Sequence, residues 1–230
     1  MDFSNQHVVV TGGAGALGTA VVEMLIGAGA ICHVPCFHEA EAQRFRLRDN
    51  KSVKLSIVGN LADEAAVDGF YGQIGPLWAS IHIAGGFAFG ALREAEVATI
   101  RQQIDMNFMS CMLCCRAAIR GMPGGGRIVN VAARAALEWR SGANMVAYAA
   151  SKSAVAAMTV ALSEELAKDG IWVNAVAPSI MDTAANRNSM PRADFALWPK
   201  VEEVAATIAF LASPDNRVTR GAVVPVYGKS

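Results

Sequence analysis

Short apolar segments that resemble strands alternate with amphipathic segments along the whole chain, and this alternation restricts the possible folds more than any other feature. The strand-like segments are 7–10, 30–35, 53–58, 78–83, 127–131, 171–177 and 222–226. Helical patterns separate them at 17–28, 39–48, 63–71, 93–119, 146–168 and 201–211. Such units place successive strands parallel, with helices on both faces. The sequence predicts one α/β domain over residues 1–230: a doubly wound parallel sheet of about seven strands.

Composition and charge exclude several classes of protein. Hydrophobic residues make up 53% of the chain and charged ones 17%, which excludes a disordered protein. Twenty basic residues balance twenty acidic ones, so neither nucleic acid nor a membrane surface is an expected partner. The N-terminal residues lack a signal-peptide pattern, and the expected location is the cytoplasm.

Five cysteines do not form a disulfide framework, because their number is odd and no secretory signal accompanies them. Cys111 and Cys114 have C-x-x-C spacing, but they fall within an apolar helical stretch. Small buried thiols are common in such helices. We therefore interpret these cysteines as core residues and expect no metal site.

A glycine-rich turn joins the first strand to the first helix. It contains Gly12, Ala14, Gly15, Ala16, Leu17 and Gly18. Such a turn lets backbone amides approach a pyrophosphate at the positive end of the helix. The turn has no Walker lysine, which argues against a nucleoside triphosphate. The alternative is a turn that serves only close packing.

Tyr148 and Lys152 are four residues apart on a predicted helix, so their side chains share one face. An ammonium group beside a phenol favours the phenolate. Lowering a tyrosine pKa from about 10 to about 7 requires roughly 4 kcal/mol. Tyr148 is therefore a candidate general acid or base. The alternative is a surface pair without chemistry.

Together with Asn107, Ala84-Gly85-Gly86 and the segment 173–178, these motifs resemble the short-chain dehydrogenase/reductase family. They occur in the family's order and cover nearly the whole chain. The resemblance implies a Rossmann-like fold, NAD or NADP as cofactor, and hydride transfer to or from a small-molecule substrate. It also implies a homodimer or homotetramer formed through the helices at 93–119 and 146–168.

The resemblance further implies individual roles. Tyr148 would exchange the proton, Lys152 would lower the tyrosine pKa and hold the nicotinamide ribose, and Asn107 would bend its helix and seat a water. The remaining implied cofactor contacts are Asn60, Leu61, Ala84, Gly85, Gly86, Pro178, Ile180 and Thr183, together with the glycine-rich turn.

The sequence departs from the family where a serine normally holds the substrate oxygen, since Ala133 takes that place. The neighbouring Arg134 either steers a substrate or is an ordinary surface residue. Losing such a hydroxyl costs roughly 2.7–4 kcal/mol when the reaction needs it. A nucleotide-binding protein with weakened catalysis is therefore an alternative.

Several stretches are similar to the quinonoid dihydropteridine reductase subgroup, which works without that serine. The similarity is greatest at 179–199, a loop-rich region whose length suggests a substrate lid. Candidate substrate residues in this lid are Arg187, Met190 and Trp198. An electron-poor quinonoid ring is the substrate that this similarity implies.

The cofactor choice between NAD and NADP stays open. The position where an acidic residue would hold the adenosine ribose is Cys36. His38 or Arg44 could instead reach a 2′-phosphate. His82, which precedes the Ala84 segment, is interpreted as a packed, hydrogen-bonded residue.

Overall fold

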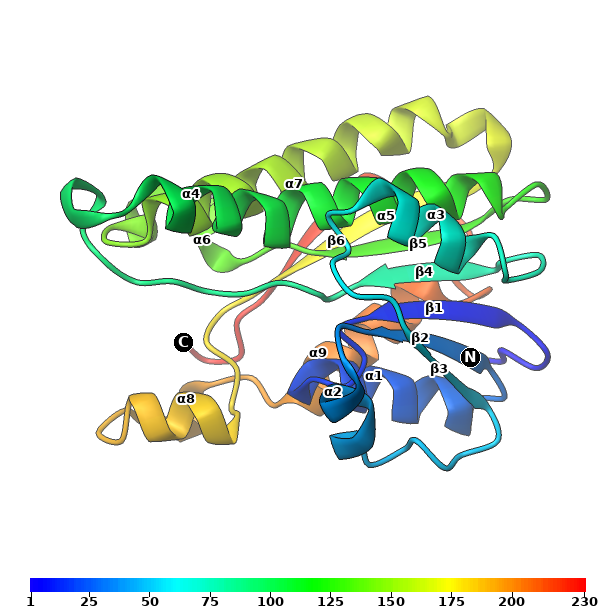
Figure 1. The fold of residues 1–230 in the computed structure, drawn as a ribbon, viewed down its shortest axis with the longest axis horizontal. Helices are drawn as coiled ribbons and strands as arrows, with labels where there is room; N and C mark the ends of the chain where they lie inside the picture. The colour runs from blue at the N-terminus through cyan, green and yellow to red at the C-terminus, as the bar shows by residue number, and fades with distance from the viewer.

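A computed structural model describes residues 1–230. Seven parallel strands form one sheet in the order β3-β2-β1-β4-β5-β6-β7. The strands are β1 (His7–Thr11), β2 (Ile31–Cys36), β3 (Val53–Ile57), β4 (Ala79–His82), β5 (Gly126–Val131), β6 (Ile171–Pro178) and β7 (Val223–Val226). The order reverses between β1 and β4, so the chain winds outward in both directions from the middle of the sheet (Figure 1). This single-domain Rossmann-like fold confirms the predicted fold class.

Helices cover both faces of the sheet (Figure 1). One layer contains α1 (Ala16–Gly27), α2 (Glu39–Arg44) and α9 (Val201–Ala212). The other contains α3 (Glu64–Tyr71), α4 (Val97–Ile104), α5 (Ser110–Arg120), α6 (Arg134–Leu137) and α7 (Val146–Glu165). The short helix α8 (Ala184–Ser189) lies apart from both layers. The remaining helical turns are η1 (Leu92–Glu94), η2 (Asp105–Met109), η3 (Trp139–Gly142), η4 (Ala167–Asp169) and η5 (Phe195–Leu197).

Two hydrophobic clusters fill the space between the sheet and its helix layers. Strand β1 contributes to both, because successive side chains of a strand point to opposite faces. Val8 and Val10 pack on the side of α1 and α9, whereas Val9 packs on the side of α3, α5 and α7. A sheet buried on both faces explains why its strands are almost continuously apolar.

The helix expected over 93–119 is divided. It consists of η1, α4, the π-helical turn η2 and α5. Asn107 lies in η2, and its Nδ2 donates to the backbone O of Gln103 at 3.0 Å. A side chain that inserts into the backbone ladder in this way widens a helical turn. A π-helical turn therefore lies at Asn107, where the family resemblance implies a bend. A second boundary also moved: α2 ends at Arg44 rather than at 48, because Phe45 turns into the core.

By length and composition alone, α7 is long and apolar enough to cross a membrane. In the fold it packs on the sheet and buries Lys152, Val155 and Thr159. Core helices of α/β domains have the same composition. The prediction of a domain without a membrane span is therefore consistent with the role of α7 in the fold.

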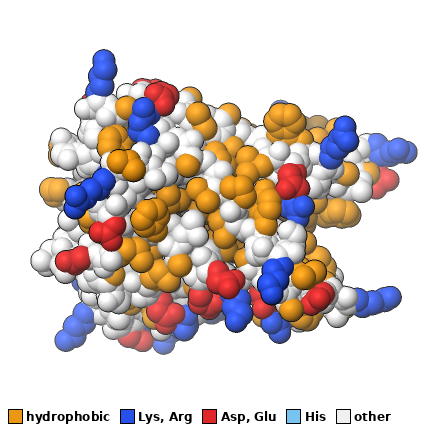
Figure 2. Space-filling view, turned by 180° about the vertical axis from the view of Figure 1, so that it is seen from behind, with side chains coloured by type: hydrophobic (Ala, Val, Ile, Leu, Met, Phe, Trp, Pro, Cys, Tyr) orange, Lys and Arg blue, Asp and Glu red, His pale blue; other side chains and the backbone are white.

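The predicted lid at 179–199 has structure of its own. It contains α8 and η5, and Asp182 pairs with Lys200 in an isolated bridge. Seen from behind, the molecule is hollowed at one end, between two projecting lobes (Figure 2). In Figure 1 this is the end where α8 lies on one side and α4 and α6 lie on the other. The lid therefore borders an opening rather than closing it.

Candidate active site

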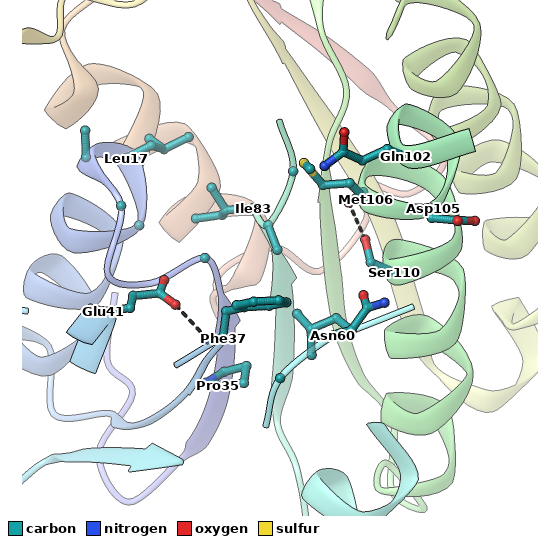
Figure 3. Close-up of a pocket in the computed structure, with 18 of the residues that line it drawn as sticks. Leu17, Pro35, Phe37, Glu41, Asn60, Ile83, Gln102, Asp105, Met106 and Ser110 are labelled. Atoms are coloured by element: carbon teal, nitrogen blue, oxygen red, sulfur yellow. Dashed lines mark hydrogen bonds between the residues drawn. The ribbon is translucent and has the colours of Figure 1, made fainter. Parts of the chain in front are cut away.

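A cleft of about 710 Å³ opens beside β1 and β4, where the strand order reverses. Ligands of doubly wound sheets bind at such a crossing. Figure 3 shows Phe37 and Glu41 on one side of the cleft, and Gln102, Asp105 and Met106 on the helical side. The expected cofactor residues that line it are Gly12, Gly15, Ala16, Leu17, Gly18, Asn60, Leu61, Ala84 and Gly85.

The glycine-rich turn has a shape that side chains would not allow. Gly12 has φ +65°, and a Cβ there would lie 2.8 Å from the backbone N of Ala84. A Cβ on Gly18 would overlap the backbone O of Gly12. Helix α1 begins without a side-chain cap and without an acidic residue in its first turn, so its first amides remain available to an anion. These features fit a dinucleotide pyrophosphate.

Other expected cofactor residues lie outside the cleft lining. Ala14 packs against the core, and Pro178 is buried at the end of β6. Thr183 caps α8, where its Oγ1 accepts from the backbone N of Asn186 at 3.2 Å. Ile180, on the lid, is 44% exposed. A contact between the last three and the nicotinamide end remains a prediction of the family resemblance.

Cys36 requires a correction. It is the last residue of β2, and only 1% of it is exposed because its side chain belongs to the core. The next residue, Phe37, lines the cleft and is 61% exposed. Glu41 also lines the cleft, and its Oε2 accepts from the backbone N of Phe37 at 2.7 Å. This part of the cleft is therefore lined by Phe37 and Glu41, while the Cys36 side chain faces the core.

Asn107 is buried against the loop that follows β4. The Gly86 amide donates to Asn107 Oδ1, and Asn107 Nδ2 donates to the Gly86 carbonyl, both at 3.0 Å. A Cβ on Gly85 would lie 2.5 Å from Asn107 Oδ1 and 3.4 Å from Lys152 Nζ. Gly85, in the cleft wall, therefore lies beside Asn107 and Lys152, two of the three predicted catalytic residues.

Lys152 is buried on α7, and its Nζ donates to the backbone O of Val131 at 2.7 Å. Burial lowers the pKa of Lys152 to about 8, and the nearby Cys111 opposes this shift. The ammonium group therefore titrates close to neutral pH. It is positioned by the end of β5, the strand that also leads to Ala133.

Tyr148 stands one helical turn before Lys152 and packs edge-on against Phe87, with ring centroids 5.1 Å apart. Burial raises the pKa of Tyr148 to about 12. Without further positive charge, the phenol keeps its proton at neutral pH. The geometry thus provides a proton donor that a cationic partner could turn into a base.

Ala133, which the resemblance assigns to the family's serine position, follows the end of β5. Ala133 is buried there and precedes α6. Arg134 Nε donates to Glu138 Oε2 at 2.7 Å, and its guanidinium lies 5.1 Å from the centroid of the Tyr227 ring. Arg134 is thus already paired within the protein.

The lid residues Arg187 and Trp198 hold the lid together. Arg187 donates to both carboxylate oxygens of Asp182, at 2.5 and 2.7 Å, and lies 4.9 Å from the Phe195 ring. Trp198 is buried beside Phe195, with ring centroids 5.0 Å apart. Met190 follows α8 and is half-buried. None of the three lines the cleft, so their contact with a substrate remains a prediction.

The sequence did not predict one wall of the cleft. Helix α4 and its π turn supply it, through Ala98, Arg101, Gln102, Asp105 and Met106. Their spacing of three and four residues marks one helical face. Most residues of this face are polar, as on any solvent-exposed helix. The sequence pattern therefore does not show that the face borders a binding site.

Comparison with known proteins identifies the family. Its sequence profile, described as short chain dehydrogenase, matches residues 6–194. The chain is 31% identical to the subunit BbsD of a (2S)-[(R)-hydroxy(phenyl)methyl]succinyl-CoA dehydrogenase from Thauera aromatica, over 99% of this chain and 97% of the relative. It is 32% identical to galactitol 2-dehydrogenase from Rhizobium johnstonii, over 97% and 94%. A cyclic-di-GMP-binding biofilm dispersal mediator from Escherichia coli is 28% identical, over 98% and 97%.

A solved structure agrees with the fold. The crystal structure of a proposed gluconate dehydrogenase from Agrobacterium tumefaciens superimposes with a TM-score of 0.89 at 24% identity, covering 99% of this chain and 96% of that one. The family profile and the relatives extend over nearly the whole chain. The chain therefore belongs to the short-chain dehydrogenase/reductase family and is an oxidoreductase that uses a nicotinamide dinucleotide.

Proposed function

We propose that the protein transfers hydride between NAD(H) or NADP(H) and a small carbonyl, hydroxyl or quinonoid compound, with Tyr148 as the proton donor or acceptor. The observation that supports this most is the contact of Asn107 and Lys152 with Gly85. That glycine lies in the wall of the cleft, and Tyr148 is one turn from Lys152. These positions support a single site that combines the cleft, the phenol and the amine.

Each residue has a defined task in the reduction. A nicotinamide dinucleotide bound in the cleft would supply the hydride with its electron pair. As the substrate carbon gains the hydride, the π electrons of its C=O bond move to oxygen, which takes the proton of the Tyr148 hydroxyl. The Lys152 ammonium stabilises the phenolate that remains. In oxidation, the phenolate removes the proton instead.

Asn107 acts mainly by position. Its amide holds both polar groups of Gly86 and the carbonyl of Gln103. This arrangement fixes the loop after β4, which forms one wall of the cleft, relative to α5. The second lone pair of its Oδ1 is the one place left for a bound water.

For the cofactor, the residues at the adenosine end favour NAD(H). The Glu41 carboxylate would accept hydrogen bonds from ribose hydroxyls, and it would repel a 2′-phosphate. It also occupies the Phe37 amide, which a phosphate would otherwise use. His38 Nδ1 accepts from the Glu41 amide at 3.1 Å, so the histidine is committed to capping α2. A preference for NAD(H) follows from these contacts.

The substrate is best sought among electron-poor acceptors. Ala133 offers no hydroxyl to polarise a carbonyl, so a ketone loses one stabilising hydrogen bond. A quinonoid dihydropterin, or a similar planar ring that takes hydride readily, needs that donor less. The lid similarity at 182–198 supports the same class, which makes a dihydropteridine reductase-like activity the narrower candidate.

We further propose a homodimer or homotetramer. Apolar side chains are exposed on the α4, α5 and α7 layer at Val97, Met112 and Val160. On the rear face, apolar side chains gather in the middle and charged ones around them (Figure 2). Apolar patches of this kind are typical of contacts between subunits. Light scattering of Val160→Glu against the unmodified protein tests this proposal, which requires the variant to dissociate.

Tyr148→Phe tests the reaction. We expect turnover of an NADH-dependent panel, including quinonoid dihydropterin, to fall about 10²–10⁴-fold, while NADH binding measured by fluorescence is retained. The matched control is Tyr71→Phe, which also removes a phenol hydroxyl, here bonded to Ser80 outside the cleft at 2.8 Å. Its turnover should stay within about threefold of the original.

Two outcomes would contradict the proposal. Unchanged turnover in Tyr148→Phe would remove the tyrosine from the mechanism. NADH binding by the unmodified protein without turnover on any carbonyl or quinonoid compound would instead favour the nucleotide-binding alternative with weakened catalysis.

A further inference from the structure

A cluster of soft donor atoms lies outside the reaction just described. Strand β4 contributes His82, and α5 contributes Cys111 and Cys115. The distance to His82 Nδ1 is 3.9 Å from Cys111 Sγ and 3.4 Å from Cys115 Sγ, and all three atoms lie within 4.8 Å of one another. The C-x-x-C spacing of Cys111 and Cys114 does not form the pair. Residues four apart share a helical face, so Cys115 is the partner.

The cluster is fully enclosed and firmly held. His82, Cys111 and Cys115 are all buried. The other ring nitrogen of His82, Nε2, lies 2.8 Å from Ser80 Oγ. A hydrogen-bond partner on the far nitrogen fixes the orientation of an imidazole. Nδ1 then faces the two sulfurs and Asn130 Oδ1.

Three polar side chains crowd around one acceptor oxygen at this point. Cys111 Sγ lies 3.3 Å, Cys115 Sγ 3.5 Å and His82 Nδ1 2.8 Å from a single atom, Asn130 Oδ1. A carbonyl oxygen has two lone pairs, so three protons cannot all be accepted well. Replacing those protons by one cation between the three donor atoms would remove this competition and leave the Asn130 carbonyl oxygen facing the positive charge.

We propose that His82, Cys111 and Cys115 form a three-coordinate site for a soft monovalent cation, Cu(I). Thiolate and imidazole are ligands that select such ions. Metal–ligand bonds of about 2.0–2.3 Å place neighbouring donor atoms about 3.5–4 Å apart, close to the separations seen here. Binding releases the thiol protons to solvent and changes no oxidation state.

Charge balance favours a monovalent over a divalent ion. Two thiolates and Cu(I) carry a net charge of −1. The buried Lys152, whose Nζ donates to the backbone O of Val131 beside Asn130, would compensate that charge. Zn²⁺ with the same ligands would leave the buried lysine charge without a counterpart, which is costly.

The position of the cluster in the fold has a consequence for stability. Ser110, the residue before Cys111, lines the nucleotide cleft, so the cluster lies behind the cleft wall. A bound ion would join β4 to α5 one turn after Asn107. We therefore expect loading to stabilise the fold, and this effect does not depend on the proposed reaction.

In the test, the reduced full-length protein competes with bathocuproine disulfonate for Cu(I) without oxygen. Native mass spectrometry then counts the ions bound per chain. We expect one Cu(I) per chain and a rise in Tm. Cys111→Ser and Cys115→Ser should each weaken retention by more than about 100-fold. Cys114→Ser is the matched control, since it changes an equally buried thiol of the same helix that lies outside the cluster. Its retention should be unchanged.

Three results would overturn the site. They are no transfer of Cu(I) to the unmodified protein, equal retention in Cys111→Ser and Cys114→Ser, and tighter binding of Zn²⁺ than of Cu(I). Should the serine variants fail to fold, X-ray absorption of the loaded unmodified protein decides, because the site requires two sulfur ligands and one nitrogen ligand.

Discussion

Asn107 and Gly86 hold each other through two hydrogen bonds, one in each direction and both 3.0 Å long. One amide side chain thereby satisfies a backbone N–H and a backbone C=O of the loop after β4. The same side chain bonds the Gln103 carbonyl within its own helix. The π turn and the cleft wall are thus two consequences of one residue.

Asn107→Ala should uncouple these features. Three hydrogen bonds are lost at a buried position, so the free energy of unfolding should fall by about 2–4 kcal/mol. Turnover should fall further than this loss explains, because the wall at Gly85 moves. Chemical denaturation and steady-state kinetics on the same samples measure both.

The matched control is Asn174→Ala, which removes a buried asparagine that belongs to β6. Asn174 Nδ2 donates to the Thr219 carbonyl at 2.8 Å, and its Oδ1 accepts from the Ala222 amide at 3.1 Å, away from the cleft. We expect a similar loss of stability with turnover retained. Equal losses of turnover in both variants would mean that Asn107 has a structural role only.

Gly85→Ala should impair NADH binding without unfolding the protein. The added Cβ would lie 2.5 Å from Asn107 Oδ1, so the loop or the amide must shift. A displacement of about 1 Å in a site can cost about 10²-fold in activity. Calorimetric titration with NADH checks the binding. Gly69→Ala on α3 is the control, since its Cβ meets no atom within 4 Å and should be neutral or stabilising. NADH affinity that is unchanged in Gly85→Ala would separate this loop from the cofactor site.

Lys152→Met should abolish turnover but stabilise the fold at pH 7. The folded-state pKa of Lys152, about 8, lies below the ordinary value of 10.5, so folding disfavours the charged form. Below pH 8 the free-energy cost of burying the charged lysine has its full value. It disappears as the pH rises from 8 to 10.5, because only the unfolded chain still binds the proton there. The stability advantage of the variant should therefore be largest near neutral pH, at most about 3 kcal/mol, and shrink toward pH 10. A constant difference across pH 7–10 would show that Lys152 is not desolvated.

The fold could be predicted because its determinants are local. Apolar runs such as Val8-Val9-Val10 need burial on both faces, and glycine marks the first strand-to-helix turn. The boundaries at Phe45 and Asn107 could not be predicted in the same way. In each case a tertiary contact, with the core or with Gly86, ends or widens a helix that its own residues would continue.

Backbone shape made the glycine-rich turn predictable, and Gly12 and Gly18 line the cleft. The catalytic role of the Tyr148–Lys152 pair stays a prediction. The sequence could not predict those parts of the site that depend on the direction of a side chain. Cys36 and Phe37 are neighbours, yet one points into the core and the other into the cleft. Similarly, Arg187 pairs with Asp182 within the lid, through a contact that the sequence does not specify.

Glu41→Gln should relax the choice of cofactor. Removing the carboxylate ends its repulsion of a 2′-phosphate, so NADPH affinity should rise about tenfold, which corresponds to about 1.4 kcal/mol. NADH affinity should fall or stay constant. Glu39→Gln is the matched control, because it removes the same charge from an exposed position of α2 that does not line the cleft. Equal NADPH gains in both variants would point to general charge, and an unmodified protein that prefers NADPH would refute the assignment.

Ala133→Ser restores a hydroxyl where the family usually has one. If the missing donor limits the reaction on simple ketones, kcat/KM for them should rise by about 10²-fold, while turnover of a quinonoid compound changes little because that ring already accepts hydride readily. The new hydroxyl could instead cap α6, whose first turn has no side-chain cap. In that case thermal stability would increase without any gain on ketones. Steady-state kinetics on both substrate classes, measured beside the melting curve, distinguish the two results. A tenfold or larger gain on quinonoid compounds alone would contradict the argument that they do not need the donor.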